Sequence, residues 1–226
     1  MGLTSPGSQT NNTIVRIDYS EENRPAVISV LSKLDPRTLD RAALAVSLAV
    51  VAEVNPHQLD LPTPCADWRL GELIAHLVAE NRGFAANATR PPGEVSREVW
   101  RPGPGDAGAL ADYPGSVEAV TAAFAPDGVL DAAVEVREFG VHPGRIAVAM
   151  HFIDYLTHSW DVARSIGLPD PIPAELAEAA LDLAALIPAE RPAGSPFAAV
   201  VPVVADASAG DRWLGLVGRD PQWSTP

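Results

Sequence analysis

The sequence predicts an all-α protein, an antiparallel four-helix bundle with a short C-terminal extension. Two observations favour this class: apolar residues recur at helical spacing in several segments, and turn residues separate those segments, whereas few stretches alternate like strands. The chain has 226 residues, of which 47% are hydrophobic, so it can bury a core of its own. We place the bundle at 35–226 and treat residues 1–34 as an N-terminal extension that is partly flexible.

The first two predicted helices begin at residues suited to a helix start. "DPRTLDRAALAVSLAVVAEV" opens with Asp35, a good N-cap, and with Pro36 at the first helical position, which predicts a helix over 36–54. Asp67 is a reasonable N-cap for a second helix over 68–88, in which leucines repeat every three to four residues.

The rest of the chain is divided by proline and glycine. The stretch 89–115 is rich in both, which predicts a long loop, and loops of that length are often functional. We therefore expect it to shape any pocket of the bundle. The remaining elements are predicted as helices over 116–125, 145–166 and 173–187, a short piece over 128–137, and a short helix over 209–218.

Charge and cysteine content exclude several classes of protein. The formal net charge is −13, from 29 acidic and 16 basic residues, whereas nucleic-acid binders and polybasic membrane-surface proteins need a basic face. Cys65 is the single cysteine, so no disulfide forms within the chain, and a reducing cytoplasm is the simplest setting. Neither a membrane-spanning run nor a signal peptide is recognised, which favours a cytoplasmic protein.

Polar side chains interrupt an apolar helix in "HFIDYLTHSWDVARSIG", residues 151–167. Asp154 and His158 are four residues apart and therefore share a helix face with apolar neighbours, and His76 lies on the leucine stripe of the second helix. Imidazole and carboxylate groups bind divalent ions, and a catalytic site keeps three protein ligands and one open position. This pattern favours a metal site at His76, Asp154 and His158. By spacing alone, a structural His76 and a hydrogen-bonded Asp154–His158 pair remain alternatives.

Two further polar residues of this helix have less definite roles. His151 is interpreted as a donor behind the ligands, a substitute ligand or a solvent-facing residue. Asp161 is expected to form a structural hydrogen bond or an ion pair, with Arg164 or the region of Arg82 as its partner.

Other reactive or aromatic residues receive structural interpretations. Trp68 and Trp160 are expected to be core aromatics, and Cys65 a small buried residue at the entry to the second helix rather than a nucleophile, because no base accompanies it. The chain has no G-x-S-x-G motif, so a serine hydrolase function is not indicated.

Three segments in order, "LPTPCADWRLGELIAHLVAENR", "DYLTHSWDVARSIG" and "VVADASAGDRWLGLVGRDPQW", resemble the actinobacterial DinB-like metal-binding proteins related to mycothiol-dependent maleylpyruvate isomerase. The resemblance covers about residues 35–223. It implies a DinB-like four-helix bundle that binds one divalent ion through His76, Asp154 and His158. The isomerase has glutamate at the acidic position, so Asp154 is one methylene shorter.

The resemblance implies a reaction and its partners. A divalent ion, zinc first with nickel and iron as alternatives, would bind the small thiol mycothiol, and the thiolate would attack a small electrophile, as in a transferase or isomerase. Maleylpyruvate itself is not expected as the substrate, because a dianion needs arginine partners and the sequence does not place Arg101, Arg145 or Arg219 near the ion. A homodimer is implied by analogy only.

Two other functions stay open at this point. One is a non-enzymatic or stress-related bundle with a structural ion, which a fourth protein ligand such as His151 would favour. The other is a helical interaction module that binds no metal.

Overall fold

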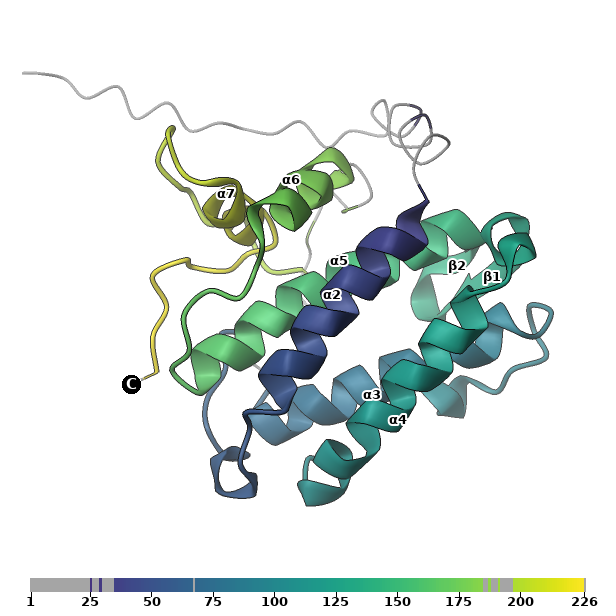
Figure 1. Ribbon diagram of the computed structural model, residues 1–226, viewed down its shortest axis with the longest axis horizontal. Helices are drawn as coiled ribbons and strands as arrows, with labels where there is room; N and C mark the ends of the chain where they lie inside the picture. The colour runs from purple at the N-terminus through teal and green to yellow at the C-terminus, as the bar shows by residue number, and fades with distance from the viewer. Residues whose placement is uncertain are drawn as a thin grey trace, which may run out of the picture.

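The computed structural model describes residues 25, 29, 35–66, 68–184, 187, 191 and 197–225, and it is helical apart from one small hairpin (Figure 1). The predictions for residues 1–34 therefore lie almost entirely outside the described residues. The helices are α2 (Pro36–Val51), α3 (Leu70–Ala88), α4 (Ala107–Phe124), α5 (Gly144–Ser165), α6 (Ala174–Asp182) and α7 (Ala209–Leu216). The antiparallel strands are β1 (Ala133–Val136) and β2 (Gly140–Pro143).

Helices α2, α3, α4 and α5 form a four-helix bundle, which confirms the predicted fold class. Hydrogen bonds from Tyr155 to Leu77 and between His151 and Asn81 show that α3 and α5 run antiparallel. Within the bundle α2 packs along α5, and α3 packs along α4.

The pair α3 and α4 runs parallel, an exception to the predicted antiparallel arrangement that the long connection between the two helices makes feasible. Gly71 at the start of α3 touches Gly105 just before α4, and Asn81 further along α3 bonds Ser116 further along α4. A Cβ on Gly71 would lie 2.0 Å from the carbonyl oxygen of Gly105, so this close approach requires glycine. The connection between the two helices thus brings the chain back to the end of the bundle at which α3 began.

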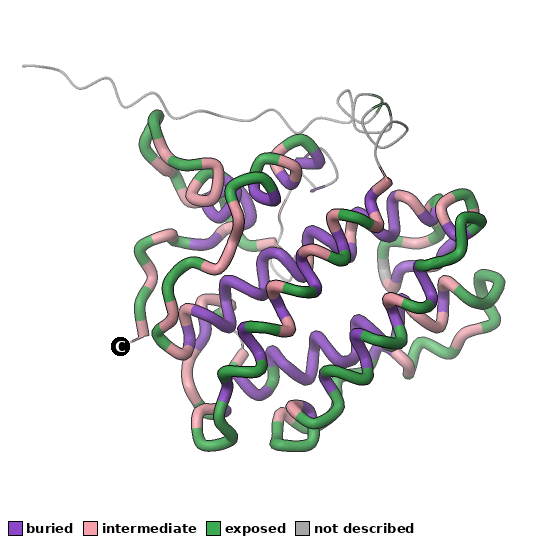
Figure 2. Tube along the Cα trace, in the orientation of Figure 1, coloured by how far each residue is buried: buried purple, intermediate pink, exposed green. Residues whose placement is uncertain are grey.

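Helix α5 lies at the centre of the molecule and is buried over almost its whole length (Figure 2). It contacts α2, α3 and both strands of the hairpin. Because apolar side chains surround it, every polar side chain that it carries needs a partner in the interior. This burial is why the sequence of α5 shows little amphipathic pattern and why its polar residues are informative.

The prediction of a loop over 89–115 is wrong at its end. Helix α4 begins at Ala107, where Asp106 caps it by accepting a hydrogen bond from the amide of Gly108, and Pro114 lies inside the helix. The local preference of proline for a helix end is overruled by burial, since Tyr113 is fully buried and its hydroxyl bonds Ser47 of α2.

Other predicted elements also change. The short piece over 128–137 consists of a 3₁₀ turn, Asp127–Asp131, followed by strand β1, which pairs with β2. The first helix ends at Val51, and α3 begins at Leu70, with Glu72 accepting a hydrogen bond from the amide of Arg69. Asp67, the predicted cap, is outside the described residues.

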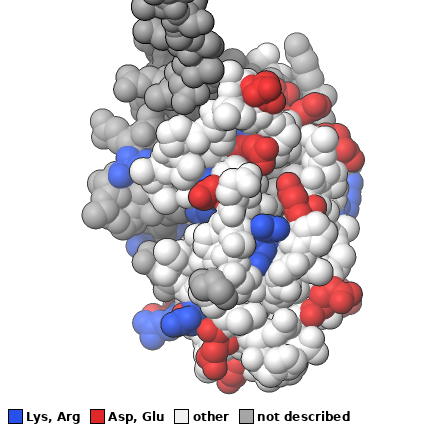
Figure 3. All heavy atoms as spheres, turned by 90° about the vertical axis from the view of Figure 1, so that its left-hand side faces the viewer, with Lys and Arg blue, Asp and Glu red and all other residues white. Residues whose placement is uncertain are grey.

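The C-terminal segment folds back on the bundle through α6 and α7, which pack on each other. Trp213 is fully buried, and the backbone carbonyl of Trp223 accepts hydrogen bonds from Arg164. No described helix has the length and hydropathy needed to cross a membrane. On the face in Figure 3, basic side chains are interspersed with acidic ones rather than gathered into a stripe.

Candidate metal centre

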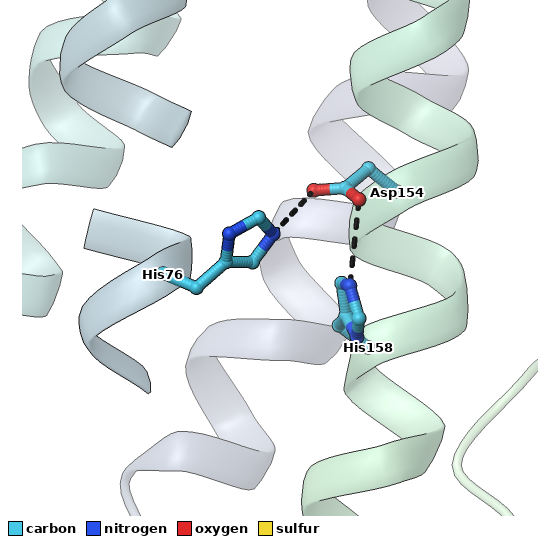
Figure 4. A group of neighbouring side chains, drawn as sticks. All are labelled: His76, Asp154 and His158. Atoms are coloured by element: carbon cyan, nitrogen blue, oxygen red, sulfur yellow. Dashed lines mark ion pairs between the residues drawn. The ribbon is translucent and has the colours of Figure 1, made fainter. Parts of the chain in front are cut away.

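Three side chains from two helices converge inside the bundle, and they are the three that the sequence predicted as ligands. His76 comes from the middle of α3, and Asp154 and His158 come from successive turns of one face of α5 (Figure 4). Their candidate ligand atoms all lie within 4.8 Å of one another. The two imidazoles are almost completely buried, and the side chain of Asp154 is 30% exposed, so the group opens toward solvent on the aspartate side.

The distances from Asp154 to the two imidazoles suit a shared cation. His76 Nε2 lies 3.9 Å from Asp154 Oδ2, and His158 Nε2 lies 3.5 Å from Asp154 Oδ1. A metal with bonds of about 2 Å joins donor atoms that are about 3–4 Å apart. These separations are too long for hydrogen bonds, so the side chains face one another without bonding directly.

Two of the facing atoms are buried and have no hydrogen-bond partner among the described residues: His76 Nε2 and Asp154 Oδ2. Burial lowers the pKa of the His76 imidazole to about 3, so the ring is neutral at neutral pH and presents a lone pair. A neutral imidazole nitrogen and a carboxylate oxygen, both buried and unsatisfied, are the donors that a divalent ion takes. The residues present therefore fit the ion that the resemblance implies.

A buried ion pair lies behind His158, and we call Asp161 and Arg219 the inner arm. His158 Nδ1 lies 2.8 Å from Asp161 Oδ2, and the Arg219 guanidinium donates to both oxygens of Asp161, with a shortest distance of 2.9 Å. Burial alone would raise the pKa of Asp161, but Arg219 and His158 outweigh it and hold the pKa below its ordinary value. The carboxylate thus fixes the ring of His158 with Nε2 toward the site.

A second carboxylate and guanidinium lie behind His76, and we call Glu80 and Arg137 the outer arm. Glu80 Oε1 is 3.6 Å from His76 Nδ1, one helical turn along α3, and Arg137 from the end of the hairpin pairs with Glu80. The Glu80 side chain is 6% exposed and that of Arg137 is 30% exposed. Both imidazoles therefore have a carboxylate on the side that faces away from the site.

Comparison with known proteins gives a family match over more than half of the chain. The profile of the mycothiol maleylpyruvate isomerase N-terminal domain matches residues 41–163. The chain belongs to this family. The predicted resemblance is confirmed, and His76, Asp154 and His158 all lie within the matched range.

Two relatives and one solved structure extend the comparison. The uncharacterized proteins MT0763 and Rv0738 of two strains of Mycobacterium tuberculosis are each 30% identical over 191 residues, which is 82% of this chain and 98% of theirs. A crystal structure of a point mutant of mycothiol-dependent maleylpyruvate isomerase matches with a TM-score of 0.54 at 16% identity, over 68% of this chain and 69% of that one. At that identity the likeness shows the fold, a DinB-like helical bundle.

His151 does not belong to the group of candidate ligands, although it lies one helical turn before Asp154. Its Nδ1 lies 2.7 Å from Asp40 of α2 and its Nε2 lies 3.2 Å from Asn81 of α3, and the ring stacks on Tyr155. It is fully buried, so the solvent-facing interpretation is wrong. Both ring nitrogens are used within the core, so His151 is not a substitute ligand.

Trp68 and Cys65 lie in the segment that leads into α3. The Trp68 ring is 4.4 Å from the His76 ring and 5.9 Å from that of His158, so this half-buried tryptophan forms a wall of the site and is more than a core aromatic. Trp160, in contrast, is buried as predicted. Cys65 is half-buried rather than buried, and its backbone carbonyl accepts hydrogen bonds from Thr63 and Trp68.

Sequence reasoning missed most of what lies behind the imidazoles. Asp161 forms an ion pair as predicted, but with Arg219 rather than with Arg164 or Arg82. Glu80 could have been found, because it follows His76 by four residues on the same helix. Arg137 and Arg219 carry no such signal, since a hairpin and a C-terminal segment deliver them.

Proposed function

We propose that the chain binds one divalent metal ion through His76, Asp154 and His158 and acts as a mycothiol-dependent transferase or isomerase on a small electrophile. The observation that carries this proposal is the pair of buried, unsatisfied atoms, His76 Nε2 and Asp154 Oδ2, which face each other 3.9 Å apart. Leaving such atoms unpaired is costly, and a cation relieves both at once.

Charge supports an anionic ligand at the remaining position. Glu80 is paired with Arg137 and Asp161 with Arg219, so the two arms contribute no net charge. A divalent ion and the Asp154 carboxylate would leave one positive charge, which a single thiolate neutralises. A bound divalent ion supplies Lewis acidity, lowering the pKa of a coordinated thiol so that the nucleophilic thiolate forms near neutral pH.

The surroundings of the three residues suit a small molecule that arrives from one side. Asp154 is the most exposed of the three, so a ligand approaches along that edge. Trp68 covers the two imidazoles and excludes water from their faces. Mycothiol is proposed because it is the thiol named both for the family and for the isomerase that shares the fold. Zinc is the first choice of ion, since imidazole and carboxylate ligands suit it.

The alternative of a structural ion is less well supported. Structural zinc sites usually have four protein ligands. Among the described residues only His76, Asp154 and His158 form a group that could hold an ion, and His151 is bonded to Asp40 and Asn81 instead. A site with three protein ligands and an exposed edge is the arrangement that leaves room for a reactant.

Metal binding and turnover are tested separately. Metal-free protein is dialysed against zinc, nickel and iron, with His158→Ala as the test variant and His57→Ala, an exposed histidine of another segment, as the matched control. We expect one ion per chain in the wild type and the control, and loss of binding in His158→Ala. Consumption of mycothiol is then followed with activated alkenes, epoxides and halides. Metal binding without any thiol consumption would favour the structural ion, and no binding at all would end the proposal.

A further inference from the structure

Behind each imidazole of the candidate centre, a carboxylate and then a guanidinium lie in the same order. On each side an imidazole Nδ1 faces a carboxylate, and the carboxylate meets a guanidinium: His158, Asp161 and Arg219 on one side, His76, Glu80 and Arg137 on the other. The carboxylate follows its histidine by three residues on α5 and by four on α3. Different elements supply the two guanidinium groups, so the repeated order does not arise from one local motif.

Glu80 is a costly residue for the interior of α3. Its side chain is 6% exposed, and burial of an ionised carboxylate is tolerated only when charges and hydrogen bonds compensate it. The guanidinium of Arg137 supplies the compensating positive charge. An apolar residue at this position would extend the buried stripe of α3 without any such cost.

Arg137 reaches Glu80 from a backbone conformation that is itself unfavourable. Its φ is +29°, in the left-handed region, and it is the one non-glycine residue with positive φ in the described part of the chain. The guanidinium lies 5.7 Å from the centre of the Trp100 ring, which supports the planar group from one side. The turn between β1 and β2 is thus shaped so that a cation reaches the buried carboxylate.

We propose that Glu80 is a positioning residue for the metal site, which accepts a hydrogen bond from Nδ1–H of His76 so that Nε2 faces the ion, and that Arg137 is its counter-ion. The inference rests on the proposed metal site and extends it to residues that contact no reactant. A metal-bound histidine ordinarily donates its other ring N–H to a carboxylate, which fixes the tautomer and the ring orientation. The 3.6 Å separation of Nδ1 and Oε1 would shorten to a hydrogen bond when Nε2 is bound.

The test measures metal binding in the absence of any thiol. Zinc affinity is determined by competition with a chelator for wild type and Glu80→Gln, and we expect a loss of about 10- to 100-fold in the variant. The matched control is Asp112→Asn, which removes a carboxylate from an ion pair between α3 and α4 that is more than half exposed, and it should bind zinc like the wild type.

A spectroscopic signature separates positioning from a purely structural role. In the zinc-loaded wild type, nitrogen NMR should show His76 with Nε2 bound to metal and a proton on Nδ1, and the Nδ1–H signal should shift in Glu80→Gln but not in Asp112→Asn. Arg137→Gln should also weaken zinc binding, and Arg137→Lys should restore most of it. Both Arg137 variants keep Glu80, so they test the positioning role even if Glu80→Gln does not fold.

Each outcome bears on either this proposal or the proposed function. Equal zinc affinity in wild type, Glu80→Gln and Arg137→Gln would overturn the positioning role and leave the proposed function standing. A Glu80 effect on zinc binding without thiol consumption would support the positioning role and count against the reaction. A wild type that binds no zinc, nickel or iron would overturn both.

Discussion

The inner and outer arms of the candidate centre perform the same task with different rigidity. In the inner arm Asp161 is completely buried, the Arg219 side chain is 6% exposed, and the carboxylate lies 2.8 Å from His158. In the outer arm the corresponding distance is 3.6 Å, and the Arg137 side chain is 30% exposed. One imidazole is therefore fixed by the core before any ligand binds, whereas the other depends on a hairpin at the surface. The comparison suggests that His158 defines the position of the site and His76 adjusts to it.

Removing the charge of the inner arm should have the largest effect. Asp161→Asn leaves the buried Arg219 guanidinium without its counter-ion, and breaking one partner of a buried pair costs about 3–5 kcal/mol. Chemical denaturation of the metal-free protein measures this loss. Asp112→Asn, from an exposed pair, should change stability by less than about 1 kcal/mol. If the two variants were equally stable, the inner arm would not be the rigid one.

Addition of zinc tests whether the two imidazoles share an ion. An ion that binds only the folded state at a free concentration 100 times its Kd adds about 2.7 kcal/mol to the free energy of unfolding. We expect this stabilisation in the wild type and none in His158→Ala, measured by thermal denaturation with and without zinc. His57→Ala should keep the full effect, because His57 is exposed and outside the group. A zinc effect that survives His158→Ala would place the ion elsewhere.

Acid should destabilise the metal-free protein through His76 in particular. The folded-state pKa of about 3 is below the ordinary value of 6.5, so between these pH values the unfolded chain binds a proton that the folded chain does not. The stability due to the neutral ring is thus present above about pH 6.5 and falls as the pH is lowered, by about 1.4 kcal/mol per unit, or about 2 kcal/mol from pH 6 to 4.5.

Substitution of His76 isolates that contribution. His76→Gln should flatten the dependence of unfolding free energy on pH over this range, whereas His57→Gln should leave it unchanged. An unchanged slope in His76→Gln would mean that the ring is charged in the folded state, which would contradict its burial beside the site.

The outer arm should contribute least to the stability of the metal-free protein. Arg137→Gln leaves the Glu80 carboxylate, which is 6% exposed, without its counter-ion, but the new amide can still donate a hydrogen bond and water reaches the Arg137 side of the pair, so we expect destabilisation of about 1–2 kcal/mol. Arg219→Gln, the equivalent change in the fully buried inner arm, should cost more in the same denaturation experiment. Similar losses for the two arginines would remove the contrast between the arms.

Prediction from sequence succeeded where one helix decides the geometry. The spacing of Asp154 and His158 places them on one face of α5, whatever packs against it, and the stripe through Leu70 and Leu73 places His76 on the buried face of α3. It failed for α4. The preference of Pro114 for turns predicted a loop, but Tyr113 is buried through its contact with α2, and the sequence does not show that contact. The metal ligands themselves stay a prediction, as do the cytoplasmic location and the homodimer.

The sequence by itself determined which residues share a helix face, since helical periodicity is a local property of the chain. It thereby selected His76, Asp154 and His158 as candidates and also contained the His76–Glu80 and His158–Asp161 spacings. Only the tertiary structure decided that α3 and α5 meet at these turns, that His151 points to Asp40, and that Arg137 and Arg219 reach the two carboxylates. Those contacts join distant parts of the chain, and their partners are set by how whole elements pack rather than by any local pattern.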